Sequence, residues 1–252
     1  MSRVGAENPM HAARIAELLH PFLQEASDQR PTTNDDLYQH ISTYIDILLR
    51  WNARINLTAI RNPEEIVSRH FGESLFAASH LFPRVYALPS ASPVVDFDFD
   101  LVNDQRTTTN DRAAERVADV GAGAGFPGLP MKLWAPNIAL TLIESNHKKA
   151  TFLREVARAL TLTDINIQNS RAEALPPVNF DVVTLRAVER LTDVLPTAAK
   201  IVAPSGRLAL LIAYAQLEAI RSTLPYLTWD PPIPIPESKS RLILVGHPEP
   251  LR

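Results

Sequence analysis

Four of the eight glycines in this chain fall within one short stretch. They are Gly121, Gly123, Gly125 and Gly128. The residues before them, 117–120, are typical of a buried strand, and those that follow are typical of a helix. Glycine has no Cβ and tolerates positive φ, so such a turn can bend sharply and let a bound molecule approach the backbone. The pattern predicts a nucleotide-like ligand; a tight turn without a ligand is the alternative, although it rarely needs more than one or two glycines.

An acidic residue closes the next predicted strand. Residues 138–143 are apolar, and Glu144 follows them, 23 positions after Gly121. A carboxylate at this place can accept hydrogen bonds from both hydroxyls of an adenosine ribose. NAD and S-adenosylmethionine both carry that ribose, so Glu144 does not choose between them. Its position near the next helix N-terminus would also favour the helix dipole.

Two later strand ends carry further candidates. The pair Ala172-Glu173 follows the predicted strand 165–168, and Arg186 ends the predicted strand 180–185. Ligands of open α/β sheets bind outside the carboxyl ends of the strands, so these residues should gather at one rim with the glycine turn. A surface ion pair is the alternative for Glu173 and for Arg186. Arg186 interrupts an apolar strand end, where a charged group needs a partner.

The chain divides into three regions. Residues 1–83 carry helical periodicity and predict an N-terminal helical region. Residues 84–116 are rich in Pro, Ser, Asp, Thr and Asn without sustained periodicity, which predicts a mobile surface insertion. From 117 to 252 strands and helices alternate, which predicts an α/β, Rossmann-like core with a mostly parallel sheet.

The C-terminal part of that core departs from the alternation. The extended runs 226–235 and 241–245 predict an antiparallel edge of the sheet. Pro204-Ser205-Gly206 predicts a turn before a buried strand at 208–212.

The composition excludes several classes of protein. The chain has no cysteine, so it has no disulfide, thiolate metal site or cysteine nucleophile. Its seven histidines show no paired ligand spacing, and we expect no metal site. We expect no membrane span and no secretory signal, and hence a cytoplasmic protein. The net charge of −3 conceals basic clusters within 50–70 and 147–158, which suit either solvated helix faces or a phosphate-binding surface.

Three motifs occur in order along the chain: Arg-Trp-Asn-Ala-Arg-Ile-Asn-Leu-Thr-Ala-Ile at 50–60, Arg-His-Phe-Gly-Glu-Ser-Leu at 69–75, and the glycine-rich run at 119–130. They resemble the RsmG family, also called GidB, of bacterial small-subunit ribosomal RNA methyltransferases. The resemblance covers roughly residues 37–212. It implies a class I methyltransferase that uses S-adenosylmethionine to methylate N7 of a guanine in 16S rRNA, as free RNA or in a small ribosomal subunit or assembly particle. We expect a monomer.

The resemblance also implies site residues. With the glycine turn included, the expected cofactor-binding residues are Gly121, Gly123, Gly125, Phe126, Glu144, Ala172, Glu173 and Arg186. The expected RNA-binding residues are Arg54, Arg69, His70, Lys148 and Arg171. Arg186 and Arg171 are the candidates for the catalytic role, in which they would orient a phosphate or the guanine edge.

The chemistry agrees with this expectation. Methylation of a pyrimidine at C5 requires a cysteine nucleophile, which the chain lacks. Guanine N7 carries a free lone pair and no proton, so its methylation needs orientation and no general base. A small-molecule methyltransferase and a non-catalytic cofactor-binding module remain as alternatives. An NAD dehydrogenase is disfavoured, because no suitably placed acid for hydride transfer is visible.

Overall fold

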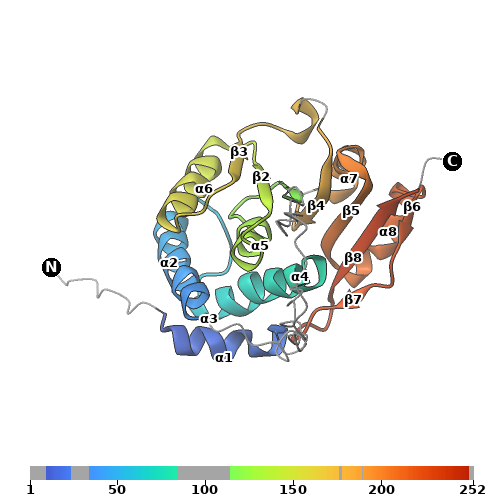
Figure 1. Cartoon of the computed structure of the whole chain (residues 1–252). Coiled ribbons are helices and arrows are strands. Elements are labelled where there is room, and N and C mark those ends of the chain that lie inside the picture. The colour runs from blue at the N-terminus through green and yellow to red at the C-terminus, as the bar shows by residue number, and fades with distance from the viewer. Residues whose placement is uncertain (1–9, 24–33, 84–113, 176–177, 189, 250–252) are drawn as a thin grey trace, which may run out of the picture.

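The computed structural model describes residues 10–23, 34–83, 114–175, 178–188 and 190–249. Within them, eight strands form one sheet in the order β3-β2-β1-β4-β5-β8-β6, with β7 paired to β8 (Figure 1). The predicted insertion lies outside the described residues, apart from 114–116.

The five strands that precede the C-terminal edge are mutually parallel. They are β1 (Arg116–Val120), β2 (Ala139–Ile143), β3 (Ile165–Gln168), β4 (Phe180–Arg186) and β5 (Val202–Ala213). Strand β1 lies between β2 and β4, where the strand order changes direction. The carboxyl ends of parallel strands share one rim of the sheet, and a ligand site is expected at such a point of reversal.

The predicted antiparallel edge is confirmed. Strand β8 (Arg241–Pro248) pairs antiparallel with β5 on one side, and with β6 (Leu227–Trp229) and β7 (Ile233–Pro234) on the other. The first residue of β8, Arg241, is paired with Ala213 at the end of β5, so it reaches the carboxyl rim of the parallel strands.

One local prediction is wrong. Residues 204–206 were expected to form a turn, yet they lie within β5, which begins at Val202. The pairing of β4 with β5 shifts there, from Phe180 opposite Val202 to Val182 opposite Arg207. A Cβ on Gly206 would lie 2.9 Å from the carbonyl oxygens of Phe180 and Asp181. Proline and glycine thus accommodate an irregularity in a paired strand.

Helices cover both faces of the sheet. The first face carries the N-terminal helices with α5 and α6, and the second carries α7 and α8, as the two hydrophobic clusters show (Figure 1). The helices are α1 (Ala12–Leu23), α2 (Asn34–Asn52), α3 (Pro63–Ile66), α4 (Glu73–Leu81), α5 (Gly128–Trp134), α6 (His147–Ala159), α7 (Leu191–Lys200) and α8 (Leu217–Thr223). A π-helical turn, η2 (Val67–Gly72), joins α3 to α4.

Alternate residues of β1 show why both faces are apolar. Val117 belongs to the first cluster and Ala118 to the second. This is the two-residue period of a strand buried on both faces. The N-terminal helices share the first cluster with α5 and α6, so they pack directly behind the glycine turn.

Candidate cofactor site and adjoining basic pocket

The glycine turn connects β1 to α5 and needs glycine for its backbone shape. Gly121, Gly123 and Gly125 have φ of 72°, 56° and 83°, which residues with a Cβ rarely adopt. The turn is tied to the neighbouring strand, because the amides of Gly121 and Ala122 donate to the carbonyl of Ile143 over 2.9 and 3.1 Å.

The glycines of the turn face different surroundings. A Cβ on Gly123 would have only one heavy atom within 4 Å, the carbonyl oxygen of Gly121 at 3.7 Å. A Cβ on Gly125 would instead collide with the Tyr44 hydroxyl and lie 2.6 Å from Leu129. The open side of the turn is therefore at Gly123. Packing against Tyr44 and Leu129, and not the approach of a ligand, explains why residue 125 is a glycine.

Glu144 sits beside the open side of the turn. Its side chain is buried, and its Oε2 accepts from the amide of Gly123 over 2.9 Å while its Oε1 accepts from the amide of Asn146 over 2.7 Å. Two carboxylate oxygens provide about four acceptor sites, so both can still accept from ribose hydroxyls. Glu144 therefore fits the adenosyl group that the sequence pattern predicts.

The loop after β3 borders the same place. Asn169 donates its side-chain amide to the carbonyl of Glu144 over 2.9 Å. The next residue, Ser170, has a buried hydroxyl with no hydrogen-bond partner in the described structure. Ala172 is buried, whereas Glu173 and Arg171 are exposed around a short 3₁₀ turn, Ala172–Ala174. An unpartnered hydroxyl beside a buried small residue suits a polar heterocycle such as adenine.

Arg186, at the end of β4, is buried in an ion pair. Its Nη2 lies 2.9 Å from Glu73 Oε2, and the two side chains are 4% and 2% exposed. The same nitrogen donates to the carbonyl of Arg69 over 2.6 Å, and Nδ1 of His70 lies 3.2 Å from it. Burial lowers the pKa of Arg186 to about 10, against the opposing attraction of Glu73. Arg186 thus stays charged at neutral pH and binds the N-terminal helices to the sheet.

Glu73 is shared by three arginines. Besides Arg186, the Nε of Arg69 lies 3.3 Å from Glu73 Oε1, and the Nε of Arg241 lies 3.2 Å from Glu73 Oε2. The exposed Glu65 also lies 3.9 Å from Arg69, so three guanidinium groups and two carboxylates leave one positive charge in excess. Arg69 is 45% exposed and Arg241 22% exposed in their side chains, so part of this excess reaches solvent.

His70 is a neutral member of the same network. Burial, together with the charges of Arg186, Arg241 and Arg69, lowers its pKa to about 3. Its Nε2 lies 2.8 Å from the hydroxyl of Thr58, and its ring stacks on Phe126 with centroids 4.7 Å apart. Because the guanidinium group of Arg186 has no acceptor, Nδ1 beside it carries no proton, and the proton of the ring resides on Nε2. His70 was expected as part of a basic RNA-binding surface; the structure makes it an uncharged support for the turn.

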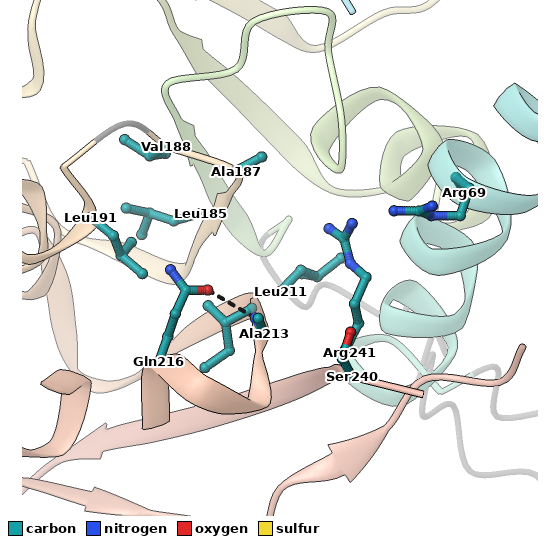
Figure 2. A pocket seen from close by; sticks show the side chains of 11 residues that line it. Arg69, Leu185, Ala187, Val188, Leu191, Leu211, Ala213, Gln216, Ser240 and Arg241 are labelled. Carbon is teal, nitrogen blue, oxygen red and sulfur yellow. Dashed lines mark hydrogen bonds between the residues drawn. The ribbon is translucent and has the colours of Figure 1, made fainter. Parts of the chain in front are cut away.

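A pocket of about 280 Å³ opens beside this cluster, at the ends of β4 and β5. Figure 2 shows the guanidinium groups of Arg69 and Arg241 on one side of it, and Leu185, Val188 and Leu191 on the other. Its wall includes Gln216, whose Oε1 accepts from the amide of Ala213 over 2.8 Å, which leaves its amide nitrogen toward the pocket (Figure 2). Val188 connects the two sites, because a Cβ on Gly121 would lie 3.2 Å from it.

The other basic candidates are exposed residues that do not line the pocket. Arg54 follows α2, Lys148 lies in the first turn of α6, and Arg171 follows β3; all three are exposed. Lys148 and Arg171 come after β2 and β3, so they share the rim with Arg186. The structure does not bring Arg54 into a described contact with the pocket.

Three residues of the site were missed by sequence reasoning: Tyr44, Glu73 and Arg241. Glu73 lies inside the 69–75 motif, and its charge next to apolar neighbours was an available signal. Arg241 opens an apolar strand, where an unpaired charge is equally unusual. Tyr44 gave no signal, because it occupies an ordinary apolar position of a helix.

Within the described residues, no group of three or more His, Cys, Asp or Glu side chains could hold a metal ion. The described helices also include none that is long and apolar enough to cross a membrane.

Comparisons with known proteins agree with the family resemblance of the sequence motifs. Relatives called ribosomal RNA small subunit methyltransferase G include one from Exiguobacterium sp., 40% identical over 59% of this chain and 53% of the relative. Another, from Xanthomonas euvesicatoria pv. vesicatoria, is 34% identical over 66% of this chain and 64% of the relative. A third, from Xylella fastidiosa, is 32% identical over 80% of this chain and 83% of the relative. The chain spans about half to two thirds of the length of the first two.

Among solved structures, a ribosomal protein L11 methylase from Lactobacillus delbrueckii subsp. bulgaricus matches with a TM-score of 0.52 and 16% identity, over 72% of this chain and 80% of that one. This likeness concerns the fold, which is the class I, Rossmann-like methyltransferase fold expected from the sequence. The family model described as rRNA small subunit methyltransferase G matches residues 37–85 and 99–224, well over half of the chain. The chain therefore belongs to the GidB family.

Proposed function

We propose that this protein is an S-adenosylmethionine-dependent methyltransferase that methylates N7 of a guanine in 16S rRNA. The observation that carries the proposal is the pairing of two sites on one rim. The open turn at Gly123 with the Glu144 carboxylate suits an adenosyl donor, and the pocket with Arg69 and Arg241 suits a nucleotide. Family membership supports both halves.

In the cofactor half, Glu144 would accept hydrogen bonds from the ribose hydroxyls, and the glycine turn would lie against the rest of S-adenosylmethionine. Ser170 and Ala172 would border the adenine, and Phe126 would support the turn from behind. S-adenosylmethionine, when bound, supplies a methyl group on a positively charged sulfur. The buried carboxylate of Glu144 lies at this end of the rim, and its negative potential favours a cationic ligand.

In the pocket, Arg69 and Arg241 would meet the anionic or acceptor edges of the target nucleotide. A guanidinium group can bind a phosphate or the O6 of guanine, and the apolar wall accommodates a purine ring. Bound in this way, guanine would present N7 toward the donor.

The transfer itself requires little proton chemistry. N7 of guanine attacks with its own lone pair, and the ring carries no proton that must leave. His70 is neutral and holds its only ring proton toward Thr58, so it acts as a support. Orientation then supplies the rate, through effective molarities on the order of 10⁵ M or more. Arg186 positions Arg69 and His70 from its buried ion pair, and the exposed Arg171 orients RNA at the mouth of the site.

The RNA surface would extend from the pocket to the exposed cations Arg54, Lys148 and Arg171, which are suited to phosphate contacts. We further propose that residues 1–83 and 117–252 work together as the RNA-binding and catalytic parts of a cytoplasmic monomer. The target RNA would present the guanine in a loop, an end or an assembly intermediate, because N7 lies in the deep major groove of A-form helices.

A methyl-transfer assay tests the proposal. Purified protein is incubated with S-adenosylmethionine labelled in its methyl group and, separately, with 30S subunits, free 16S rRNA and a panel of small metabolites. We expect label in the RNA of at least one of the first two. A 16S transcript in which 7-deazaguanine replaces guanine serves as the matched control, since it lacks only N7, and it should remain unlabelled. Label in a metabolite alone, or equal label in the 7-deaza transcript, would refute the proposal.

A further inference from the structure

The hydroxyl of Tyr44 joins two distant parts of the chain. It lies on α2 and donates to the carbonyl of Ala124, inside the glycine turn, over 2.5 Å and across 80 residues of sequence. Tyr44 is fully buried, and Ala124 is nearly so. A carbonyl in such surroundings has no water as an alternative partner, so the hydroxyl is what satisfies it.

The turn is shaped around this side chain. The space where Gly125 lacks a Cβ is occupied by the Tyr44 hydroxyl. The Tyr44 ring stacks almost parallel on Phe126, with centroids 5.3 Å apart and planes 6° apart, and His70 stacks on Phe126 at 4.7 Å. Two N-terminal segments therefore support Phe126, and one of them also holds the carbonyl two residues before it.

The peptide that Tyr44 holds adjoins the open side of the turn. The amide of Gly123 donates to Glu144, and the amide of Gly125 donates to the carbonyl of Ala122 over 2.6 Å. The carbonyl of Ala124 lies between these two bonds along the chain, and its direction limits how the flanking peptides can rotate. This carbonyl belongs to the same peptide group as the Gly125 amide, so a phenol that fixes it also fixes the direction of the Gly125 amide, in the turn that carries the Gly123 amide.

We propose that Tyr44 is a positioning residue for the cofactor, which sets the shape of the turn from the N-terminal helices. The inference rests on the proposed function, in which this turn binds S-adenosylmethionine. Burial, with a further contribution from Asp119, raises the pKa of Tyr44 well above its ordinary value, so the hydroxyl remains a donor at any working pH. The N-terminal helices are then part of the cofactor site, although none of their side chains needs to touch the cofactor.

Tyr44→Phe tests the proposal, because it removes one oxygen and keeps the stacked ring. The matched control is Ser42→Ala on the same helix. Ser42 is also buried and its hydroxyl also donates to a backbone carbonyl, that of Met10 over 2.8 Å, but this carbonyl is far from the turn in sequence. Each variant is titrated with S-adenosylhomocysteine by calorimetry, its thermal midpoint is measured without ligand, and amide hydrogen exchange of residues 121–128 is followed.

For Tyr44→Phe we expect about tenfold weaker binding of S-adenosylhomocysteine, equivalent to about 1.4 kcal/mol, and faster exchange in the turn. In methyl transfer, KM for S-adenosylmethionine should rise while kcat stays within about twofold. Ser42→Ala should lower the thermal midpoint by a similar amount and leave both binding and exchange in the turn unchanged.

Unchanged affinity in Tyr44→Phe, or an equal loss in Ser42→Ala, would overturn the inference. If Tyr44→Phe does not fold in buffer, as judged by circular dichroism, both variants are measured in trimethylamine N-oxide, which stabilises the folded state, and the outcomes are read in the same way. Failure of the wild-type protein to bind S-adenosylhomocysteine would instead count against the proposed function.

Discussion

The two halves of the rim carry opposite charge. At the ends of β1 and β2 the buried ionisable groups are the carboxylates of Asp119 and Glu144, and both accept hydrogen bonds from backbone amides of the turn that follows β1. At the last residue of β4 and the first residue of β8, the buried or half-buried groups are Arg186 and Arg241, which share Glu73 with Arg69.

Because the two halves carry opposite charge, they favour different ligands on one rim. The acidic half is closed by bonds to its own backbone and favours a neutral ribose and a cationic sulfur. The basic half has more positive charge than the buried Glu73 and the exposed Glu65 balance, so it favours an anionic polymer. Each half should therefore be separable from the other by substitution.

The largest effect is expected from Glu73→Gln in the basic half. The substitution leaves Arg186 buried without its counter-charge, which should cost about 3–5 kcal/mol in the free energy of unfolding. Urea denaturation followed by circular dichroism measures it. The control is Glu65→Gln, eight residues earlier in the chain, where the carboxylate is 50% exposed and 3.9 Å from Arg69; a loss below about 0.5 kcal/mol is expected there. Equal losses in the two variants would show that the buried network is not what holds this half together.

In the acidic half, Glu144→Gln should weaken binding of S-adenosylhomocysteine about 10- to 100-fold. The neutral side chain of glutamine loses charge-assisted hydrogen bonds, each contributing about 1.5–3 kcal/mol. Its NH₂ group would also face a backbone amide that donates to Glu144 in the wild-type protein, either that of Gly123 or that of Asn146. Calorimetry provides the measurement, with the exposed Glu218→Gln on α8 as control. RNA affinity should remain at the wild-type level; a parallel loss of RNA binding would mean that the halves are not independent.

The converse substitution, Arg241→Gln, should weaken RNA binding about tenfold and leave the affinity for S-adenosylhomocysteine unchanged. If Arg241 contacts a phosphate, the slope of log affinity against log salt should also become shallower by about 0.7–0.9. Filter binding or anisotropy with 16S rRNA fragments at several salt concentrations gives both quantities. Arg221→Gln, an exposed arginine on α8, is the control. A variant with normal RNA affinity and normal slope would remove the pocket from the RNA-binding surface.

The smallest effect is a pH dependence at Asp119. Burial raises the pKa of this carboxyl from its ordinary value to about 7, against hydrogen bonds from Gly128 and Thr184. Because the folded protein holds the proton more tightly than the unfolded chain, protonation stabilises the fold fully below about pH 4, and this contribution is lost as the pH rises to about 7.

Asp119→Asn should therefore flatten the fall in stability between pH 4 and pH 7, by at least about 1 kcal/mol relative to wild type. Thermal or urea unfolding at several pH values in this window, compared between the two proteins, measures the difference. Parallel curves would indicate that Asp119 is ionised throughout the range.

The sequence predicted those features whose causes are local. The glycine turn, the acidic end of β2 and the alternation of strands and helices each depend on a few neighbouring residues, and the structure contains all three. The turn expected at 204–206 failed because pairing with β4 before this stretch, at Val202, and after it, from Arg207 on, carries the strand through it despite its proline and glycine.

The features that were missed depend on distant partners. Tyr44 meets Ala124 across 80 residues, and Arg186 meets Glu73 across 113. No local pattern distinguishes a tyrosine that packs in a helix from one whose hydroxyl supports a ligand turn. The same reason applies to His70, whose contacts with Thr58 and Phe126 no local pattern predicts.

The central claim is that the acidic half delivers a methyl group to a guanine held by the basic half. Base-resolved mass mapping of 16S rRNA after reaction with purified protein and labelled S-adenosylmethionine tests it most directly. We predict one labelled guanine carrying the methyl on N7, with label lost in both Glu144→Gln and Arg241→Gln at limiting substrate. Label on another atom or base, or unchanged labelling in both variants, would contradict this account of the rim.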